Sequence, residues 1–296
     1  MTSAAGGATP LAEDGLPTIA AVLRREGLTP KRALGQNFLL DLSLTRRIAR
    51  AGDAPLGEVV EIGPGPGALT RALLAEGAEH VIAIERDRRC LPALQEIAAH
   101  WPGKFTLLEG DALTVDPRPH FRTARPQIIA NLPYNIGTAL LVAWLRDGGD
   151  ARRTWWRRAT VMLQREVAER IVAEPGGKAH GRLAVLARWR GAAELCFDVS
   201  PKAFTPPPKV TSAVVSLRPA DRPQLDAPLE ALERVTAAAF SQRRKMLRSS
   251  LKGYATASQP IEALLESAAV SPTLRADAVS AEDFARIARA VAARSG

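Results

Sequence analysis

Short apolar runs alternate with amphipathic stretches between residues 58 and 189. Runs of four or five residues rich in Val, Ile and Leu are typical of buried strands, whereas apolar residues spaced three and four apart are typical of helices. The pattern predicts strands at residues 59–62, 81–85, 105–108, 127–130 and 159–163. It predicts helices at residues 68–75, 91–99, 138–145, 166–172 and 183–189. Strands that alternate with helices at this spacing favour an open parallel α/β sheet.

The two ends of the chain have different patterns. Residues 1–17 are rich in Ala, Gly, Thr and Pro, which predicts a flexible extension with no fold of its own. Short helices are expected at 18–26 and 42–51. After Leu217 a Pro- and charge-rich linker, residues 218–228, leads into helical patterns only, at 229–251, 261–268 and 282–293. We therefore expect an extension (1–17), an α/β domain (18–217) and a small all-helical domain (218–296).

Composition and charge narrow the class of protein. Of the 296 residues, 46% are hydrophobic, which is enough to bury a core and excludes a wholly disordered chain. The net charge of +9 favours a polyanionic partner, either a nucleic acid or, less often, an acidic membrane surface. Two cysteines and four scattered histidines give no disulfide framework and no metal site. The N-terminus has no signal-peptide pattern, so we expect a cytoplasmic protein without a membrane segment.

A glycine loop follows the first predicted strand. The segment Glu61-Ile-Gly63-Pro-Gly65-Pro-Gly67 joins that strand to a helix, and glycines there allow the backbone to approach a ligand closely. Glu85 ends the next strand, where a carboxylate accepts hydrogen bonds from ribose hydroxyls. The loop suits both a dinucleotide and S-adenosylmethionine. Asp111, after the third strand, is placed to accept from an adenine amine or to serve as an ordinary turn residue.

The fourth predicted strand ends in a motif that carries chemistry. Asn131-Leu132-Pro133-Tyr134 matches the [DNS]-[LIP]-P-[YFW] pattern of methyltransferases that act on planar amino groups. The Asn131 side-chain oxygen and the Leu132 main-chain carbonyl can accept hydrogen bonds from such an amine and aim its lone pair at a methyl carbon. Pro133 fixes the backbone. Tyr134 is suited to stack on a flipped adenine.

Together with this motif, five other segments show a family resemblance. They are Gly35-Gln-Asn-Phe-Leu39, Glu61-Ile-Gly-Pro-Gly65, Gly181-Arg-Leu183, Phe204-Thr-Pro-Pro-Pro-Lys-Val210 and Gln242-Arg-Arg-Lys-Met-Leu247. In this order the chain resembles the ribosomal RNA adenine N6,N6-dimethyltransferases, and is most similar to the bacterial small-subunit (16S) members. The resemblance spans residues 31 to 252. Its departures, among them Gly137 and Ala139, remove no hydrogen-bond acceptor and no stacking ring.

The resemblance implies a Rossmann-like S-adenosylmethionine (SAM)-dependent methyltransferase sheet with a small C-terminal helical domain. It implies that Phe204 faces the second side of the target adenine, and that Gln36 belongs to a segment over the methionine end of SAM. The cofactor-binding residues it implies, with the glycine loop, are Gln36, Asn37, Leu39, Gly63, Gly65, Glu85, Asp111 and Asn131.

Two basic clusters are candidates for RNA binding. Arg243, Arg244, Lys245 and Arg248 lie in a segment that has no acidic residue. Arg152 and Arg153 precede Trp155 and Trp156. Basic groups neutralise phosphates and aromatic rings stack on unpaired bases. The alternatives are a solvated basic face and tryptophans that simply pack.

The function implied is dimethylation at N6 of two adjacent adenines near the 3′ end of 16S ribosomal RNA. The substrate would be a 30S or pre-30S particle, and nothing in the sequence demands a dimer. Three alternatives stay open: a large-subunit (23S) adenine methyltransferase of the macrolide-resistance type, a ribosome-assembly factor with dispensable catalysis, and an NAD-dependent oxidoreductase. The last has no candidate proton donor beside the glycine loop.

Overall fold

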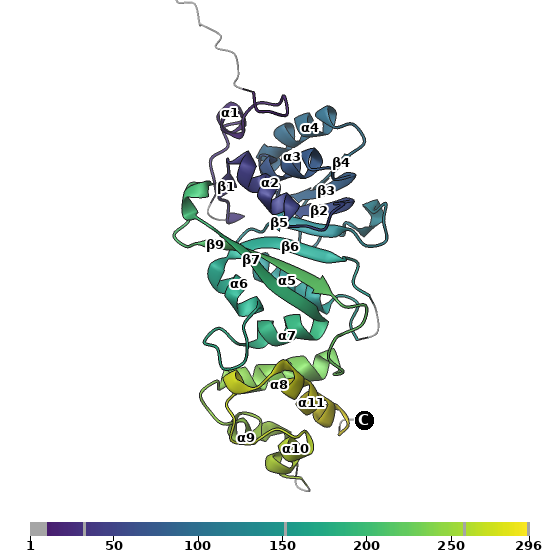
Figure 1. The fold of residues 1–296 in the computed structure, drawn as a ribbon, viewed down its shortest axis with the longest axis vertical. Helices are drawn as coiled ribbons and strands as arrows, with labels where there is room; N and C mark the ends of the chain where they lie inside the picture. Colours follow the sequence, from purple (N-terminus) through teal and green to yellow (C-terminus); the bar gives the residue numbers. More distant parts are fainter. Residues whose placement is uncertain (1–10, 32–33, 151–152, 257–258, 295–296) are drawn as a thin grey trace, which may run out of the picture. The chain divides into compact units, whose positions relative to one another are not determined.

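The computed structural model describes residues 11–31, 34–150, 153–256 and 259–294 (Figure 1). The chain divides into two compact units. The first comprises residues 1–137, 159–163 and 198–212, and the second comprises residues 138–158, 164–197 and 213–296. A seven-stranded mixed sheet runs in the order β4-β3-β2-β5-β6-β9-β7.

Four parallel strands form the core of the first unit. They are β2 (Glu58–Ile62), β3 (His80–Glu85), β4 (Phe105–Glu109) and β5 (Gln127–Asn131). The pairings of β2 with β3, β2 with β5, and β3 with β4 are all parallel. Val60, Ile82 and Ile128 are fully buried because helices cover the sheet. These four strands confirm the predicted ones to within two residues at either end.

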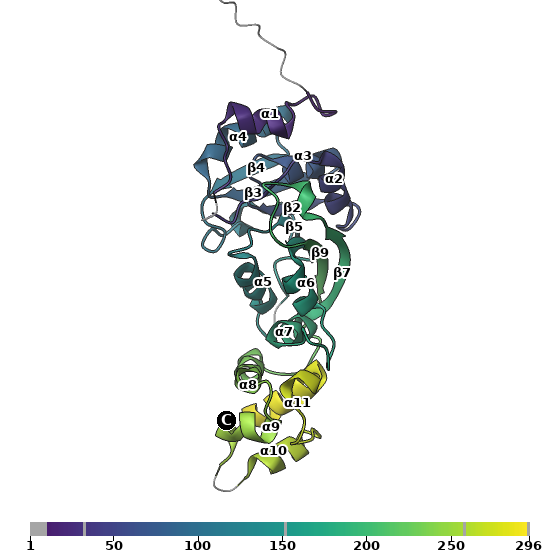
Figure 2. The ribbon, with the colours of Figure 1, turned by 90° about the vertical axis from the view of Figure 1, so that its left-hand side faces the viewer.

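The helices of the first unit are α1 (Ile19–Arg25), α2 (Leu42–Arg50), α3 (Ala68–Ala75) and α4 (Leu91–His100). Helix α3 packs on β3 and α4 on β4, and α2 lies beside α3 (Figure 2). Gly67 caps α3 with φ +88°, and a Cβ atom there would lie 2.1 Å from Ile97 Cδ1. Only glycine allows α3 to start this close to α4.

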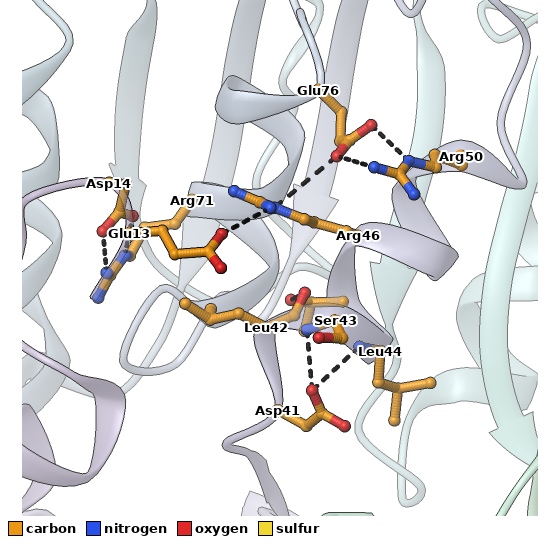
Figure 3. A network of polar contacts seen from close by, with 11 residues as sticks. Glu13, Asp14, Asp41, Leu42, Ser43, Leu44, Arg46, Arg50, Arg71 and Glu76 are labelled. Atoms are coloured by element: carbon orange, nitrogen blue, oxygen red, sulfur yellow. Dashed lines mark hydrogen bonds and ion pairs between the residues drawn. The ribbon is translucent and has the colours of Figure 1, made fainter.

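Residues 11–17 pack within the first unit, although the composition of residues 1–17 predicted an extension with no fold. Residues 1–10 of that predicted extension lie outside the described residues. Leu16 is buried, and Asp14 pairs with the buried guanidinium of Arg71 on α3. Figure 3 shows the neighbouring ion pairs, in which Arg46 lies between Glu13 and Glu76. The buried Arg71 guanidinium fixes this segment by pairing with Asp14 and donating to Pro17 O at 2.7 Å, which composition alone does not reveal.

The second unit is built mainly of helices. It also contains most of the two strands that end the sheet order, at residues 191–197 and 213–219. Its helices are α5 (Gly137–Arg146), α6 (Arg165–Ile171), α7 (Arg182–Arg190), α8 (Leu229–Ser241), α9 (Leu247–Ser250), α10 (Ile261–Ser267) and α11 (Ala281–Ala292). Ser280 caps α11, because its side-chain oxygen accepts from Asp283 N at 3.0 Å. Helices α8 and α11 lie side by side (Figure 2).

The prediction of one helix over residues 229–251 is wrong. Helix α8 ends at Ser241, and α9 starts only at Leu247. The Leu247 and Arg248 N–H groups donate to Leu274 O at 2.7 Å and Pro272 O at 3.1 Å. Backbone pairing with a segment remote in sequence replaces the helical hydrogen bonds here.

The predicted α/β sheet is confirmed, with parallel pairing among β2 to β5, but the whole sheet is mixed. Besides β6 (Arg158–Gln164), the sheet contains β7 (Gly191–Val199) and β9 (Ser212–Pro219), neither of which the pattern predicted. Strand β7 ends the sheet order and leaves Glu194 and Leu195 exposed, so its apolar alternation is weak. The predicted linker at 218–228 overlaps the end of β9 by two residues. The predicted domain boundaries stay a prediction.

Candidate functional site

A single pocket in the first unit contains every residue predicted to be catalytic or to bind the cofactor. It encloses about 990 Å³, including the part that opens to solvent. Its lining includes Gln36, Asn37, Leu39, Gly63, Gly65, Glu85, Asp111, Asn131, Leu132, Pro133, Tyr134 and Phe204. The carboxyl ends of β2, β3 and β5 meet here because parallel strands end at one edge of the sheet. The structure thus brings the residues together, while their roles stay predictions.

The carboxylate of Glu85 fixes the backbone of the glycine loop by a hydrogen bond. Glu85 Oε2 accepts from Gly65 N at 2.8 Å, and Oε1 accepts from Asp87 N at 2.7 Å. Burial raises the pKa of Glu85, while these two backbone donors oppose the shift. Gly65, at φ +56°, packs on Phe38, whose Cε1 atom would lie 3.3 Å from a Cβ. A carboxylate has about four lone-pair sites, so Glu85, which also lines the pocket, can accept further hydrogen bonds.

The Asn131–Tyr134 motif forms a turn at the end of β5. Leu132 N donates to Met162 O on β6 at 3.1 Å, and Gly137 N donates to Pro133 O at 2.9 Å. Among the described residues, no hydrogen-bond partner engages the Asn131 side chain or the Leu132 carbonyl oxygen. A Cβ on Gly63 would lie 3.3 Å from Pro133 Cγ, so the glycine loop borders the motif directly. Two acceptors therefore remain available beside the loop.

The ring of Tyr134 is fixed at its hydroxyl. Tyr134 Oη and Ser212 Oγ lie 2.5 Å apart, and Ser212 is fully buried at the start of β9. The sequence pattern did not identify Ser212, because a serine at a strand end carries no spacing signal. Gly35 lies against the same turn, at φ +64°. A Cβ atom at this position would lie only 2.7 Å from Asn135 Oδ1, so the close approach requires glycine. The segment before the sheet thus packs directly on the motif.

Phe204 lies in a two-stranded sheet that is separate from the seven-stranded one. Strand β1 (Phe38–Leu39) pairs antiparallel with β8 (Phe204–Thr205), with Leu39 opposite Phe204. This pairing joins two predicted site residues that are far apart in sequence. Phe204 is 2% exposed, so its ring forms part of the pocket wall.

Asp111 makes contacts typical of a turn residue while it also lines the pocket. Its Oδ1 accepts from Leu113 N at 3.0 Å, and its Oδ2 pairs with Arg86 Nη1 at 3.1 Å. These contacts are those of an ordinary turn residue, which is one of the two alternatives that the sequence left open for Asp111. Its remaining lone pairs leave an adenine contact open.

Glu61 is a second buried carboxyl group in the pocket. It is 1% exposed, and its Oε2 accepts from Thr70 Oγ1 at 2.6 Å. Burial, together with the nearby Glu85 carboxylate, raises the pKa of Glu61 to about 8. The folded protein therefore holds this proton at neutral pH, whereas the unfolded chain, with the ordinary value of 4.5, has lost it.

This difference predicts a pH-dependent loss of stability. Between pH 4.5 and pH 8 the folded state binds more protons at Glu61, so the free energy of unfolding falls by about 1.4 kcal/mol per pH unit from this group. Glu61→Gln removes the titration. Urea unfolding at pH 5, 6.5 and 8 should therefore show the variant gaining stability over the wild type as pH rises. Parallel curves for the two proteins would contradict the prediction.

The basic clusters lie in the second unit. Arg244, Lys245 and Arg248 are exposed, whereas Arg243 donates to Lys178 O at 2.9 Å and lies 3.6 Å from Asp277. Arg153 pairs with Asp221 at 2.6 Å, and Arg152 lies outside the described residues. Trp156 is fully buried and donates to Trp144 O, as the packing alternative requires. The exposed members of the first cluster are thus available to a partner.

Comparison with known protein families shows to which family this chain belongs. The family model described as "Ribosomal RNA adenine dimethylase" matches residues 27–293. The chain belongs to this family. The family is SAM-dependent, which favours SAM over a dinucleotide at the glycine loop.

Named members of the ribosomal RNA adenine dimethylase family are similar over nearly the whole chain. The "Ribosomal RNA small subunit methyltransferase A" of Methylobacterium radiotolerans is 58% identical over 94% of this chain and 94% of its own length. The protein of the same name from Xanthobacter autotrophicus is 56% identical, over 94% and 95% of the two chains.

Solved structures support the fold. The 23S rRNA methyltransferase ErmE superposes with a TM-score of 0.66 at 29% identity, covering 86% of this chain and all of that one. A dimethyladenosine transferase from Plasmodium falciparum gives a TM-score of 0.70 at 24% identity, covering 84% and 95%. These matches confirm the Rossmann-like methyltransferase sheet followed by C-terminal helices.

Neither a membrane span nor a metal cluster is found in the described residues. Within that part of the chain, no helix is both long enough and apolar enough to cross a membrane. In the same residues, no group of three or more His, Cys, Asp and Glu side chains is placed to hold a metal ion.

Proposed function

We propose that this protein transfers methyl groups from SAM to N6 of two adjacent adenines near the 3′ end of 16S ribosomal RNA. The product is N6,N6-dimethyladenosine. The observation that carries the proposal is the pair of unengaged acceptors, Asn131 Oδ1 and Leu132 O, beside the glycine loop. Identities of 58% and 56% to proteins named for the small subunit, against 29% for the 23S enzyme, favour the 16S substrate over the 23S alternative.

The pocket fits SAM by its donor and acceptor set. The bare backbone of Gly63 and Gly65 permits close approach, and Glu85 has lone pairs left for ribose hydroxyls. Asn37, Leu39, Asp111 and Asn131 complete the proposed contacts, with Gln36 treated below. SAM, when bound, supplies an electrophilic methyl group on a positively charged sulfur.

The motif residues position the nucleophile. The lone pair of an adenine amine is delocalised into the ring, so the nitrogen needs its hydrogens held rather than a strong base. Asn131 Oδ1 and Leu132 O accept hydrogen bonds from the two N–H groups of the amine. These hydrogen bonds draw the nitrogen toward a tetrahedral shape. The bond from Leu132 N to Met162 O fixes the peptide on one side of the second acceptor, and Pro133 fixes the other side. Positioning of this kind supplies most of the rate enhancement.

Tyr134 and Phe204 form the proposed stacking pair for the flipped base. Tyr134→Phe keeps the ring but loses the bond to Ser212, so we expect kcat to fall about threefold to tenfold. Ser212→Ala should give a similar loss, and the double variant no more than either, because both remove one contact. Single-turnover methyl transfer measures all three. Additive losses would show that the hydroxyl does not act through Ser212.

The proposed substrate is a 30S or pre-30S particle in the cytoplasm, which the protein meets as a monomer. Exposed Arg244, Lys245 and Arg248 supply phosphate contacts in this proposal. Arg153 and Arg152 form a second proposed contact. The net charge of +9 is consistent with a nucleic acid partner.

The test is methylation with labelled SAM of ribosomal particles from cells that lack this modification, followed by mapping of the modified nucleotides by mass spectrometry. We expect dimethyladenosine confined to the small-subunit RNA. Label in the large-subunit RNA would instead assign the chain to the 23S group. Bound SAM without label would support a binding-only assembly factor, and failure to bind SAM would revive the dinucleotide alternative.

A further inference from the structure

A cluster of three side chains joins the segment before the sheet to the end of β3. Asp87 lies two residues after Glu85, is 5% exposed, and accepts from both Gln36 and Arg89. Gln36 Nε2 donates to Asp87 Oδ2 at 2.9 Å, and Arg89 Nη2 donates to the same oxygen at 2.6 Å. We call these three residues, Gln36, Asp87 and Arg89, the Asp87 cluster.

The cluster also fixes the backbone around Gln36. Gln36 Oε1 accepts from Lys31 N at 3.0 Å and from Arg89 Nη2 at 3.4 Å, while Arg89 Nη1 donates to Thr29 O at 3.1 Å. The pKa of Asp87 is lowered to about 2 by its hydrogen bonds from Arg89, with burial opposing, so the carboxylate stays charged at neutral pH. Charge-assisted hydrogen bonds of this kind are among the stronger ones.

The same chain of contacts reaches the proposed cofactor site. Asp87 N donates to Glu85 Oε1, and the other Glu85 oxygen holds Gly65. On the opposite side, Gln36 is followed directly by Asn37 and then by Leu39, which both line the pocket. The cluster thus connects the carboxylate proposed to bind ribose with the segment that walls the pocket.

We propose that the Asp87 cluster positions residues 34–39 over the cofactor pocket, and that Gln36 acts within it as a positioning residue and not as a direct cofactor ligand. The amide of Gln36 is engaged at both its oxygen and its nitrogen by protein groups. The acceptors at Asn131 and Leu132 are held by the bond from Leu132 N to Met162 O and not by the cluster. Gly35, in the positioned segment, does pack beside Tyr134 and Asn135. The loss should therefore fall mainly on cofactor affinity and to a smaller extent on the methyl-transfer step. This inference rests on the proposed SAM site.

A donor–acceptor exchange tests the proposal. Asp87 Oδ1 also accepts from Arg89 N at the start of the 3₁₀ turn Arg88–Cys90, and Asp87→Asn keeps this oxygen. The new amide NH₂ group, however, lies against the amide NH₂ group of Gln36. We expect the Kd for SAM, measured by isothermal titration calorimetry, and the KM for SAM to rise about tenfold, or about 1.4 kcal/mol. The kcat at saturating SAM should fall by a clearly smaller factor than the affinity. The double variant Asp87→Asn with Gln36→Glu restores one carboxylate and one amide with exchanged places, and should recover most of the affinity.

Arg88→Ala is the matched control. Arg88 lies between Asp87 and Arg89, and its substitution removes an exposed ion pair with Glu109 but no contact of Gln36. This variant should leave the Kd for SAM unchanged. Unchanged SAM affinity in Asp87→Asn would overturn the proposal, as would a double variant as weak as the single one. A wild-type protein that binds no SAM would instead contradict the proposed function, so the two failures are distinguishable.

Discussion

Asn131→Ala is expected to lower kcat for methyl transfer by about 10²- to 10³-fold while particle binding stays unchanged. The side chain removed is one of two acceptors that hold the adenine amine, and no described residue replaces it. Loss of one preorganised hydrogen-bonding group at a reacting centre commonly costs rates of this size. The particle contacts proposed for Arg244 and Arg248 do not depend on this side chain.

The measurement is single-turnover methyl transfer at saturating SAM, beside a filter-binding assay for unmethylated 30S particles. Asn131→Asp is the control, because a carboxylate also accepts hydrogen bonds and the motif pattern admits Asp at this position. We expect the aspartate variant to retain far more activity than the alanine variant. If Asn131→Ala methylates at the wild-type rate, Leu132 O alone suffices and the proposed role of Asn131 is wrong.

Sequence was enough to predict the edge of the sheet that carries the pocket. Strands β2, β3 and β5 are short apolar runs, and the sequence marks their ends: β2 ends beside Gly63, β3 at Glu85 and β5 at Asn131. The alternation of strands with helices predicts that these strands are parallel. Glu85 and Asn131 end two of these strands. Their convergence follows from the parallel pairing of β2 with β3 and with β5.

Long-range contacts between short segments could not be predicted in this way. Strands β1 and β8 have two residues each, too few to show a period, yet their pairing places Leu39 opposite Phe204. Ser212 reaches Tyr134 because β9 begins there, and β9 follows a proline-rich segment that conceals its start. The resemblance to a family supplied Phe204, which no periodicity could have found.

The Asp87 cluster illustrates a second limit of prediction from sequence. Its residues sit in ordinary positions, a glutamine in a loop and an aspartate and arginine two apart. Sequence reasoning assigned Gln36 to the cofactor because its segment resembles the one that covers SAM in the family. The hydrogen bonds of the amide, which join residues 51 positions apart, show what it contacts.

Glu85→Gln is expected to weaken SAM binding by about 10²-fold or more, despite its similar size. Both carboxylate oxygens accept from backbone N–H groups, of Gly65 and of Asp87. A glutamine has one oxygen and one NH₂ group, so either orientation sets a donor against a buried donor. An unpaired buried donor costs about 1–3 kcal/mol, and the glycine loop that it holds shifts as well.

Isothermal titration calorimetry with SAM measures the loss, and Glu109→Gln is the matched control. Glu109 lies opposite Glu85 in the β3–β4 register, but it is exposed and pairs with Arg88, so its substitution should leave the Kd for SAM unchanged. Burial raises the pKa of Glu85, and protonation of the carboxylate removes a hydrogen-bond acceptor. Wild-type affinity for SAM should therefore fall as the pH is lowered into the acid range. The glutamine variant should lose this acid-side dependence. A wild-type Kd in Glu85→Gln would mean that ribose and loop are held by other groups.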